Sequence, residues 1–225
     1  MKKNNTMRVA AGLAIAALLS TCLVSGTYAK YATKGIASDK ARVAKFGVEV
    51  TSTGNSFATT YNNDAVKSGT TWKVVAPGTT GTFAAATLSG TPEVKVKVSN
   101  KLTTLDLSNW TVDGKFYCPI KVTVASSSTP ATPTVIDGTQ YEDKQSEFEN
   151  AIKNAVAGYE ATYNAGTDLA TDASKVSPTI TWQWAFDGDG DMDTKLGNAA
   201  AHAATDEAAP TIGLGVTTTV EQLNN

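Results

Sequence analysis

Four aspartates at alternate positions form the segment with the clearest potential for chemistry. They are Asp187, Asp189, Asp191 and Asp193. Hard cations such as Ca²⁺ bind several oxygen ligands, and the glycines between the first three carboxylates would let the backbone wrap around an ion. A helix-loop-helix calcium loop has glycine at its sixth position and a carboxylate at its twelfth, but this chain has Met192 and Asn198 there. The segment is thus a calcium candidate without the formal motif, and a soluble acidic turn is the favoured interpretation.

Few other residues could carry out catalysis. His202 is the only histidine, and the sequence has no His-Glu-x-x-His zinc pattern. Cys118 lies between Tyr117 and Pro119 at the expected start of a strand, where a buried small apolar side chain is more common than a nucleophile. A Gly-x-Ser-x-Gly elbow and a phosphate-binding loop are also missing. We therefore expect a protein that is not an enzyme and, apart from the calcium candidate, has no cofactor.

The first 29 residues have the three zones of an export signal. Three basic residues lie within the first eight, an apolar run spans residues 9–24, and small residues precede Ala29. We predict that a signal peptidase cleaves between Ala29 and Lys30. The mature protein is then secreted, to the extracellular matrix or the cell surface, and keeps no membrane span.

The same segment has two alternative interpretations, a retained membrane anchor and a lipoprotein signal. Residues 9–29 carry no charge, and a stretch of this length could remain as a membrane anchor. A lipoprotein signal ending at Cys22 is also conceivable, although Thr21 fits poorly before such a cysteine.

The predicted mature chain has 196 residues and one thiol, Cys118. A single thiol cannot form an internal disulfide, so stability must come from a packed core. The formal charge of this mature chain is −5, and it contains no basic run with interleaved aromatic residues. These features argue against a nucleic-acid partner.

Short runs of alternating apolar residues, rich in Thr and Val, predict a mainly β protein. Strands are expected at residues 46–50, 72–75, 93–98, 120–124, 180–186 and 212–220, with a hairpin turn at Asp113-Gly114. Ile180, Trp182, Trp184 and Phe186 share one face of their strand, which predicts that it is buried and central.

One helix is expected at about residues 144–163. Phe148, Ile152 and Val156 are spaced as on one helix face, Ser146 with Glu149 fits a capping box, and Gly166 follows as a stop. Seven or eight strands and one inserted helix predict a two-sheet jelly-roll-like sandwich over residues 45–225 with long crossovers.

Residues 30–44 are small and polar enough to form an extended N-terminal arm. Its candidate contact residues are Lys30, Tyr31, Ile36 and Val43. Such an arm can add as a strand to the open sheet edge of a neighbour, and this head-to-tail contact generates filaments. A disordered or self-folded terminus is the alternative.

Several blocks in this order resemble secreted proteins of the TasA/camelysin type. They are Ser25-Gly-Thr-Tyr-Ala29, Ala41-Arg-Val-Ala-Lys-Phe-Gly-Val48, Trp72-Lys-Val-Val-Ala-Pro-Gly78, Leu107-Ser-Asn-Trp-Thr-Val-Asp-Gly114, and Ile180-Thr-Trp-Gln-Trp-Ala-Phe186 with Asp193-Thr-Lys-Leu-Gly197. The resemblance is closest to proteins of Gram-positive bacteria, especially clostridia, that are exported with a SipW-type signal peptidase.

The resemblance implies a surface or biofilm-matrix protein with a jelly-roll domain. It also implies processing at Ala29-Lys30 and fibre assembly by donor-strand complementation, with residues 30–44 as the donor. Camelysins are described as metalloproteases, but no matching zinc motif occurs here, so that activity is not carried over.

The leading hypothesis from the sequence is a secreted structural subunit of an extracellular fibre, present as a homopolymer. The alternatives are a monomeric cell-surface binding or adhesion protein and, third, a secreted metallo-hydrolase.

Overall fold

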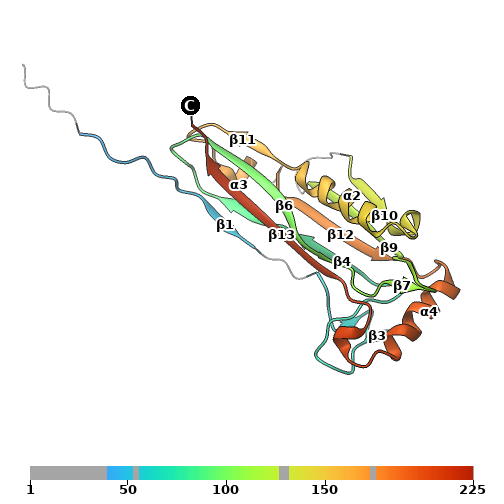
Figure 1. Cartoon of the computed structure of the whole chain (residues 1–225). Coiled ribbons are helices and arrows are strands. Elements are labelled where there is room, and N and C mark those ends of the chain that lie inside the picture. The colour runs from blue at the N-terminus through green and yellow to red at the C-terminus, as the bar shows by residue number, and fades with distance from the viewer. Residues whose placement is uncertain (1–39, 53–55, 127–131, 173–175, 225) are drawn as a thin grey trace, which may run out of the picture. The chain divides into compact units, whose positions relative to one another are not determined.

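The computed structural model describes residues 40–52, 56–126, 132–172 and 176–224 (Figure 1). The chain divides into two units, Met1–Val43 and Ala44–Asn225, and every helix and strand below belongs to the second. None of the helices among the described residues is both long and apolar enough to span a membrane.

Two antiparallel sheets form the body of the second unit. The four-stranded sheet has the order β10-β9-β12-β4 and consists of β4 (Thr80–Ala84), β9 (Ile120–Ser126), β10 (Thr134–Asp137) and β12 (Pro178–Trp184). The three-stranded sheet has the order β11-β6-β13 and consists of β6 (Val96–Asp106), β11 (Ala161–Tyr163) and β13 (Gly213–Gln222). The expected mainly β sandwich is confirmed, and β12 is central as predicted. Neighbouring strands far apart in sequence, such as β4 and β12, confirm the long crossovers.

Three short ribbons complete the strands. They pair β1 (Glu49–Thr51) with β5 (Thr87–Ser89), β2 (Thr60–Tyr61) with β3 (Val66–Lys67), and β7 (Thr111–Val112) with β8 (Lys115–Phe116). Asp113 and Gly114 join β7 to β8 with φ angles of 54° and 79°, the two positive values that a tight hairpin turn requires. The predicted turn is therefore confirmed.

The described residues contain three α-helices, where the sequence predicted one. They are α2 (Gln145–Ala157), α3 (Leu169–Asp172) and α4 (Gly190–Ala201), and two short 3₁₀ helices, η1 (Gly138–Tyr141) and η3 (Asp206–Ala208), accompany them.

The predicted end and cap of the long helix are wrong. α2 ends at Ala157, with Gly158 as its C-cap, because Ala161 to Tyr163 pair with β6 as strand β11 instead. The N-cap residue is Lys144, whose side chain makes no capping bond, so the Ser146–Glu149 capping box does not form. The buried face was predicted correctly, since Phe148, Ile152 and Val156 are all buried.

Strand alternation places the expected side chains in the core, with exceptions at strand ends. Val96 and Val98 are fully buried, and the expected residues within β9 and β12 are at most 6% exposed. Phe186 is 83% exposed, contrary to prediction, because β12 ends at Trp184. The strand predicted at 46–50 begins only at Glu49, and Phe46 and Val50 are both about two-fifths exposed, at 42% and 43%.

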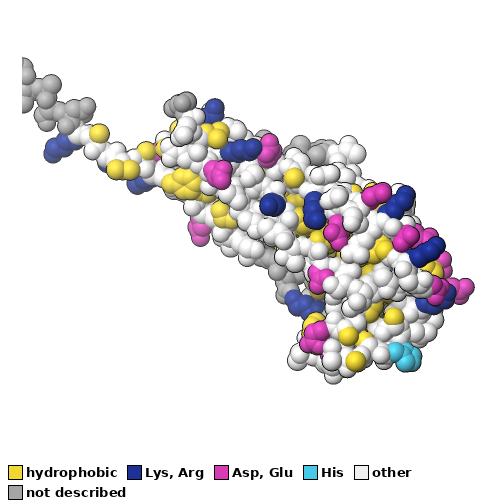
Figure 2. Space-filling view, in the orientation of Figure 1, with side chains coloured by type: hydrophobic (Ala, Val, Ile, Leu, Met, Phe, Trp, Pro, Cys, Tyr) yellow, Lys and Arg dark blue, Asp and Glu magenta, His cyan; other side chains and the backbone are white. Residues whose placement is uncertain are grey.

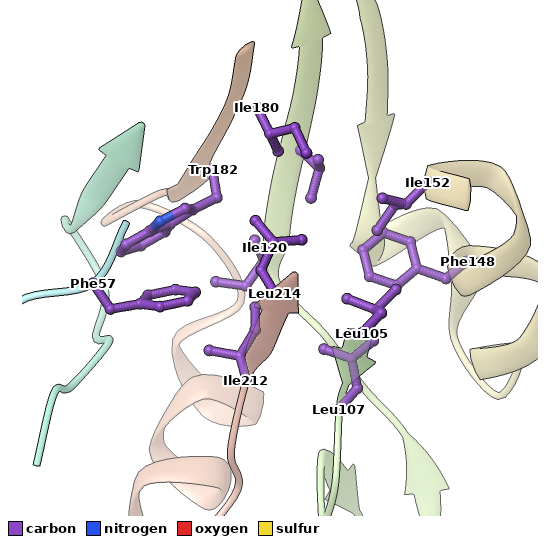
Figure 3. A pocket seen from close by; sticks show the side chains of 11 residues that line it. Phe57, Leu105, Leu107, Ile120, Phe148, Ile152, Ile180, Trp182, Ile212 and Leu214 are labelled. Carbon is purple, nitrogen blue, oxygen red and sulfur yellow. The ribbon is translucent and has the colours of Figure 1, made fainter. Parts of the chain in front are cut away.

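Both sheets and α2 contribute to the main core (Figure 3). Phe148 and Ile152 of α2 lie on one side of the sandwich interior, and the rings of Phe57 and Trp182 pack together on the other with centroids 5.2 Å apart. A gap of about 20 Å³ between them is lined by apolar residues alone. A gap this small and apolar gives a water no polar partner, so it is a packing defect and not a ligand site.

Candidate assembly edge and surface cleft

The predicted processing and arm residues fall mostly outside the described part of the chain. Ala29, Lys30, Tyr31 and Ile36 all lie there. Val43 is described, belongs to no helix or strand, and is 91% exposed. In the second unit, the backbone N–H of Lys45 donates to Glu93 Oε2, and the N–H of Glu93 donates to the Lys45 carbonyl, both at 2.9 Å. The body is thus anchored from Lys45, one residue after the predicted end of the arm.

The acidic segment forms the start of a helix. Asp189 is the N-cap of α4, and its Oδ1 accepts a hydrogen bond from the Met192 N–H at 3.1 Å. Asp191 is exposed in the first turn, where a negative charge interacts favourably with the helix dipole. Asp187 is exposed just before the cap. The predicted loop is therefore a helix cap, and the spacing of the aspartates has a structural explanation.

Asp193 is buried and pairs with two aromatic side chains. The Tyr117 hydroxyl donates to Asp193 Oδ1 at 2.8 Å, and Trp184 Nε1 donates to Oδ2 at 3.1 Å. Burial, with this hydrogen bond, raises the pKa of Tyr117 well above its ordinary value. In the part of the chain that the structure describes, no group of three or more His, Cys, Asp or Glu residues could hold a metal ion. The calcium candidate gains no support from this arrangement.

Cys118 and His202, the other two candidates for chemistry, lie in environments that explain them structurally. Cys118 is 1% exposed, and burial raises the pKa of its thiol to about 12. The thiol is therefore protonated at neutral pH and is not an activated nucleophile. His202 is exposed at the C-cap of α4, where its Nδ1 lies 2.7 Å from the Asn198 carbonyl oxygen.

β13 presents a long open edge (Figure 1). It pairs with β6 on one side, and no strand among the described residues pairs with its other side. Natural sheet edges are usually short, or carry lysine, proline or a bulge that discourages pairing with other chains. β13 has ten residues with no proline or lysine, one irregularity at Gly215/Val216 and one charge, Glu221. Residues 216–222 are thus an edge with little protection.

This edge is firmly held by its own sheet. Asn100 of β6 is buried, its Oδ1 accepts from the Thr218 hydroxyl at 2.7 Å, and its Nδ2 donates to the Tyr159 carbonyl at 2.7 Å. Leu214 and Val216 pack against the main core. β13 is therefore a fixed template for an added strand.

A second exposed feature lies where the chain enters β1. Figure 2 shows hydrophobic side chains at the surface in this region, and the exposed ones there are Phe46 and Val50. β1 pairs with β5 through three residue pairs.

A surface cleft of about 690 Å³ lies between residues 68–75 and 206–212. Trp72, 42% exposed, lines it with Phe57. The sequence predicted a strand at 72–75, but only Val74 forms a bridge, to Ala58. The turn-forming residues 68–71, directly before Trp72, are the sequence signal that favours a loop over a strand here.

The chain matches no protein-family model, and no curated protein or solved structure is significantly similar to it. The resemblance to the TasA/camelysin family thus rests on the sequence blocks alone.

Proposed function

We propose that this protein is a secreted structural subunit of an extracellular fibre, in which residues 30–44 of one copy add as a strand to β13 of the next. The observation that carries the proposal is the long, poorly protected edge of β13. Strand addition supplies main-chain hydrogen bonds along residues 216–222, so a modest arm sequence is sufficient for affinity. The donor and acceptor surfaces differ, so the contact does not close on itself and produces filaments.

Charge supports a head-to-tail contact between copies. The arm has four basic residues and one acidic residue, a formal charge of +3. Residues 45–225 have 12 basic and 20 acidic residues, a formal charge of −8. A positive arm is attracted to a negative body, which speeds their encounter and favours arm-to-body over body-to-body contact.

Cysteine cross-linking tests the proposed pairing. In mature protein starting at Lys30, Ile36→Cys in the arm is combined with Thr217→Cys, Thr219→Cys or Glu221→Cys on β13. The native Cys118 is buried and does not compete. The matched control combines Ile36→Cys with Val135→Cys, an exposed position on β10 at the edge of the other sheet.

We expect at least one β13 pair to give a ladder of disulfide-linked oligomers on a non-reducing gel, and the Val135 pair to give little. Equal ladders from both edges, or filaments without any cross-link to β13, would refute β13 as the acceptor.

A further inference from the structure

We propose that the cleft between residues 68–75 and 206–212 is a carbohydrate-binding site, in which Trp72 stacks against a ring of an uncharged oligosaccharide. This inference is independent of fibre assembly. It rests on the fixed geometry of both walls, on the exposed indole in a concave surface, and on the polar groups around it.

The wall that carries Trp72 is pinned at both ends. The N–H of Ser68 donates to the Thr59 carbonyl at 2.8 Å, and the N–H of Val74 donates to the Ala58 carbonyl at 2.9 Å. These bonds tie the segment to the strand-like stretch beside it. The loop that carries the Trp72 indole is therefore fixed by backbone hydrogen bonds at both ends.

Hydrogen bonds within the loop fix the backbone of Trp72 itself. The N–H of Thr70 donates to Ser68 Oγ at 3.1 Å, and the N–H of Trp72 donates to Thr70 Oγ1 at 3.1 Å. Holding the aromatic residue in place before binding reduces the entropy that a ligand must overcome. Such preorganisation is what a binding platform requires.

The opposite wall is equally well held. Trp110 Nε1 donates to the Thr211 carbonyl at 2.6 Å, and the Thr211 N–H donates to the Ser108 carbonyl at 3.0 Å. Asn109 Nδ2 donates to the Ala208 carbonyl at 3.1 Å. The cleft thus has two fixed sides and, between them, Phe57 packed on the core.

The chemistry of the lining suits a sugar. A sugar ring has an apolar C–H face and a rim of hydroxyls. The Trp72 indole can cover the face, while Thr71 and Asp206 line the cleft with a hydroxyl and a carboxylate that can bond the rim. The volume of about 690 Å³ is in the range of small-molecule sites, roughly 300–1,000 Å³. The lining carries one carboxylate, Asp206, and one ammonium group, Lys73, so its formal charge is zero. This balance suits an uncharged oligosaccharide of hexose or N-acetylhexosamine units.

Tryptophan fluorescence provides a selective test. The chain has four tryptophans, and Trp110, Trp182 and Trp184 are buried, so a collisional quencher such as acrylamide reaches mainly Trp72. Mature protein is titrated with a panel of chitotetraose, cellotetraose, maltotetraose and mannotetraose at millimolar concentrations. We expect at least one of them to protect Trp72 from quenching and to bind saturably by calorimetry.

Variants locate the site. Trp72→Ala should weaken binding of that sugar by about tenfold or more, because it removes the stacking surface. Trp72→Phe should lose less, and Asp206→Asn should lose affinity while the fold is unchanged. Phe186→Ala, which removes an aromatic ring 83% exposed but outside the cleft, is the matched control and should bind as the wild type does. Thermal unfolding checks that each variant is folded.

Three results would overturn the proposal. One is that no sugar of the panel binds, and another is that Trp72→Ala binds as tightly as the wild type. The third is that a peptide of residues 30–44 protects Trp72 and no sugar does, which would assign the cleft to the arm of another copy.

Discussion

Asp193 is the member of the acidic segment whose side chain is buried, and its two oxygens accept hydrogen bonds from Tyr117 and Trp184. Removing the acceptor leaves two donors unpaired in the core, and each unpaired buried group costs about 1–3 kcal/mol. We predict that Asp193→Ala lowers the free energy of unfolding by about 3 kcal/mol. Asp193→Asn should cost less because the amide keeps one acceptor. Urea denaturation followed by fluorescence measures both.

The matched control for this change is Asp191→Asn, at an exposed position two residues away. It should alter stability by no more than about 0.5 kcal/mol. Equal losses at the two positions would show that the charge of the segment matters and the buried hydrogen bonds do not.

The buried thiol of Cys118 should make the free energy of unfolding depend on pH. Its pKa is raised from 9.0 to about 12, so folding favours the protonated thiol. This stabilisation is complete below pH 9 and is lost as the pH rises through about 12. The free energy of unfolding should therefore fall more steeply over that window in the wild type than in Cys118→Ala. Tyr117, whose pKa is also raised, affects both proteins, so the difference between their slopes isolates Cys118.

The measurement is urea denaturation across this alkaline range. A thiol reagent should also label the native protein slowly and the urea-unfolded protein fast. Fast labelling of native protein at neutral pH would contradict the buried, protonated state.

At the scale of single residues, the sequence predicted which side chains of the regular strands are buried, because alternation has period two and one face of each sheet meets the core. It did not predict that Phe186 is exposed, because β12 ends where its pairing with β9 ends, at Trp184 opposite Ile120, and that pairing joins segments far apart in sequence. The role of Asp193 was also missed, since its partner Tyr117 lies 76 residues away.

Among the elements, α4 shows why a local pattern was misread. The glycines suggested a turn, and only two large apolar residues, Met192 and Leu196, indicate an apolar helix face. The evidence for a helix was the cap at Asp189 with acidic residues in the first turn. α2 was found because its apolar face is long, but its end was set by the pairing of β11 with β6, which no local pattern contains.

β13 is anchored to β6 through Asn100, and this leads to a prediction for the strand. Asn100→Ala removes the acceptor for Thr218 and a donor to the Tyr159 carbonyl. We expect a loss of about 2–4 kcal/mol in the free energy of unfolding and faster amide hydrogen exchange in residues 216–222. Lys101→Ala, at the exposed neighbouring position of β6, is the control and should change neither. Unchanged exchange in β13 with Asn100→Ala would show that the strand is held by other contacts.

For the whole molecule, the uneven charge of the arm and body predicts how the proposed assembly responds to salt. An arm of +3 and a body of −8 attract each other, and salt screens that attraction beyond about 10 Å at 0.1 M. The rate of filament growth, followed by light scattering, should therefore fall as sodium chloride is added.

A double substitution of Lys34 and Lys40 to Gln should lower the growth rate at low salt and reduce its dependence on salt. Faster growth of this variant, or growth that rises with salt in both proteins, would indicate that apolar contacts drive assembly.

The mainly β sandwich could be predicted at this scale because composition and alternation extend over most of the chain. The cleft could not, because its walls come from segments about 130 residues apart and no local pattern joins them. The open edge of β13 was likewise hidden, because strand order is decided by long-range pairing.

The most direct test of the assembly claim is negative-stain electron microscopy of a chain that starts at Lys30, the predicted mature N-terminus, beside a chain that starts at Lys45. Circular dichroism confirms that both are folded. We predict filaments from the longer chain and none from the shorter one. Filaments from both chains would contradict the arm as the polymerising strand, and filaments from neither would contradict the fibre subunit itself.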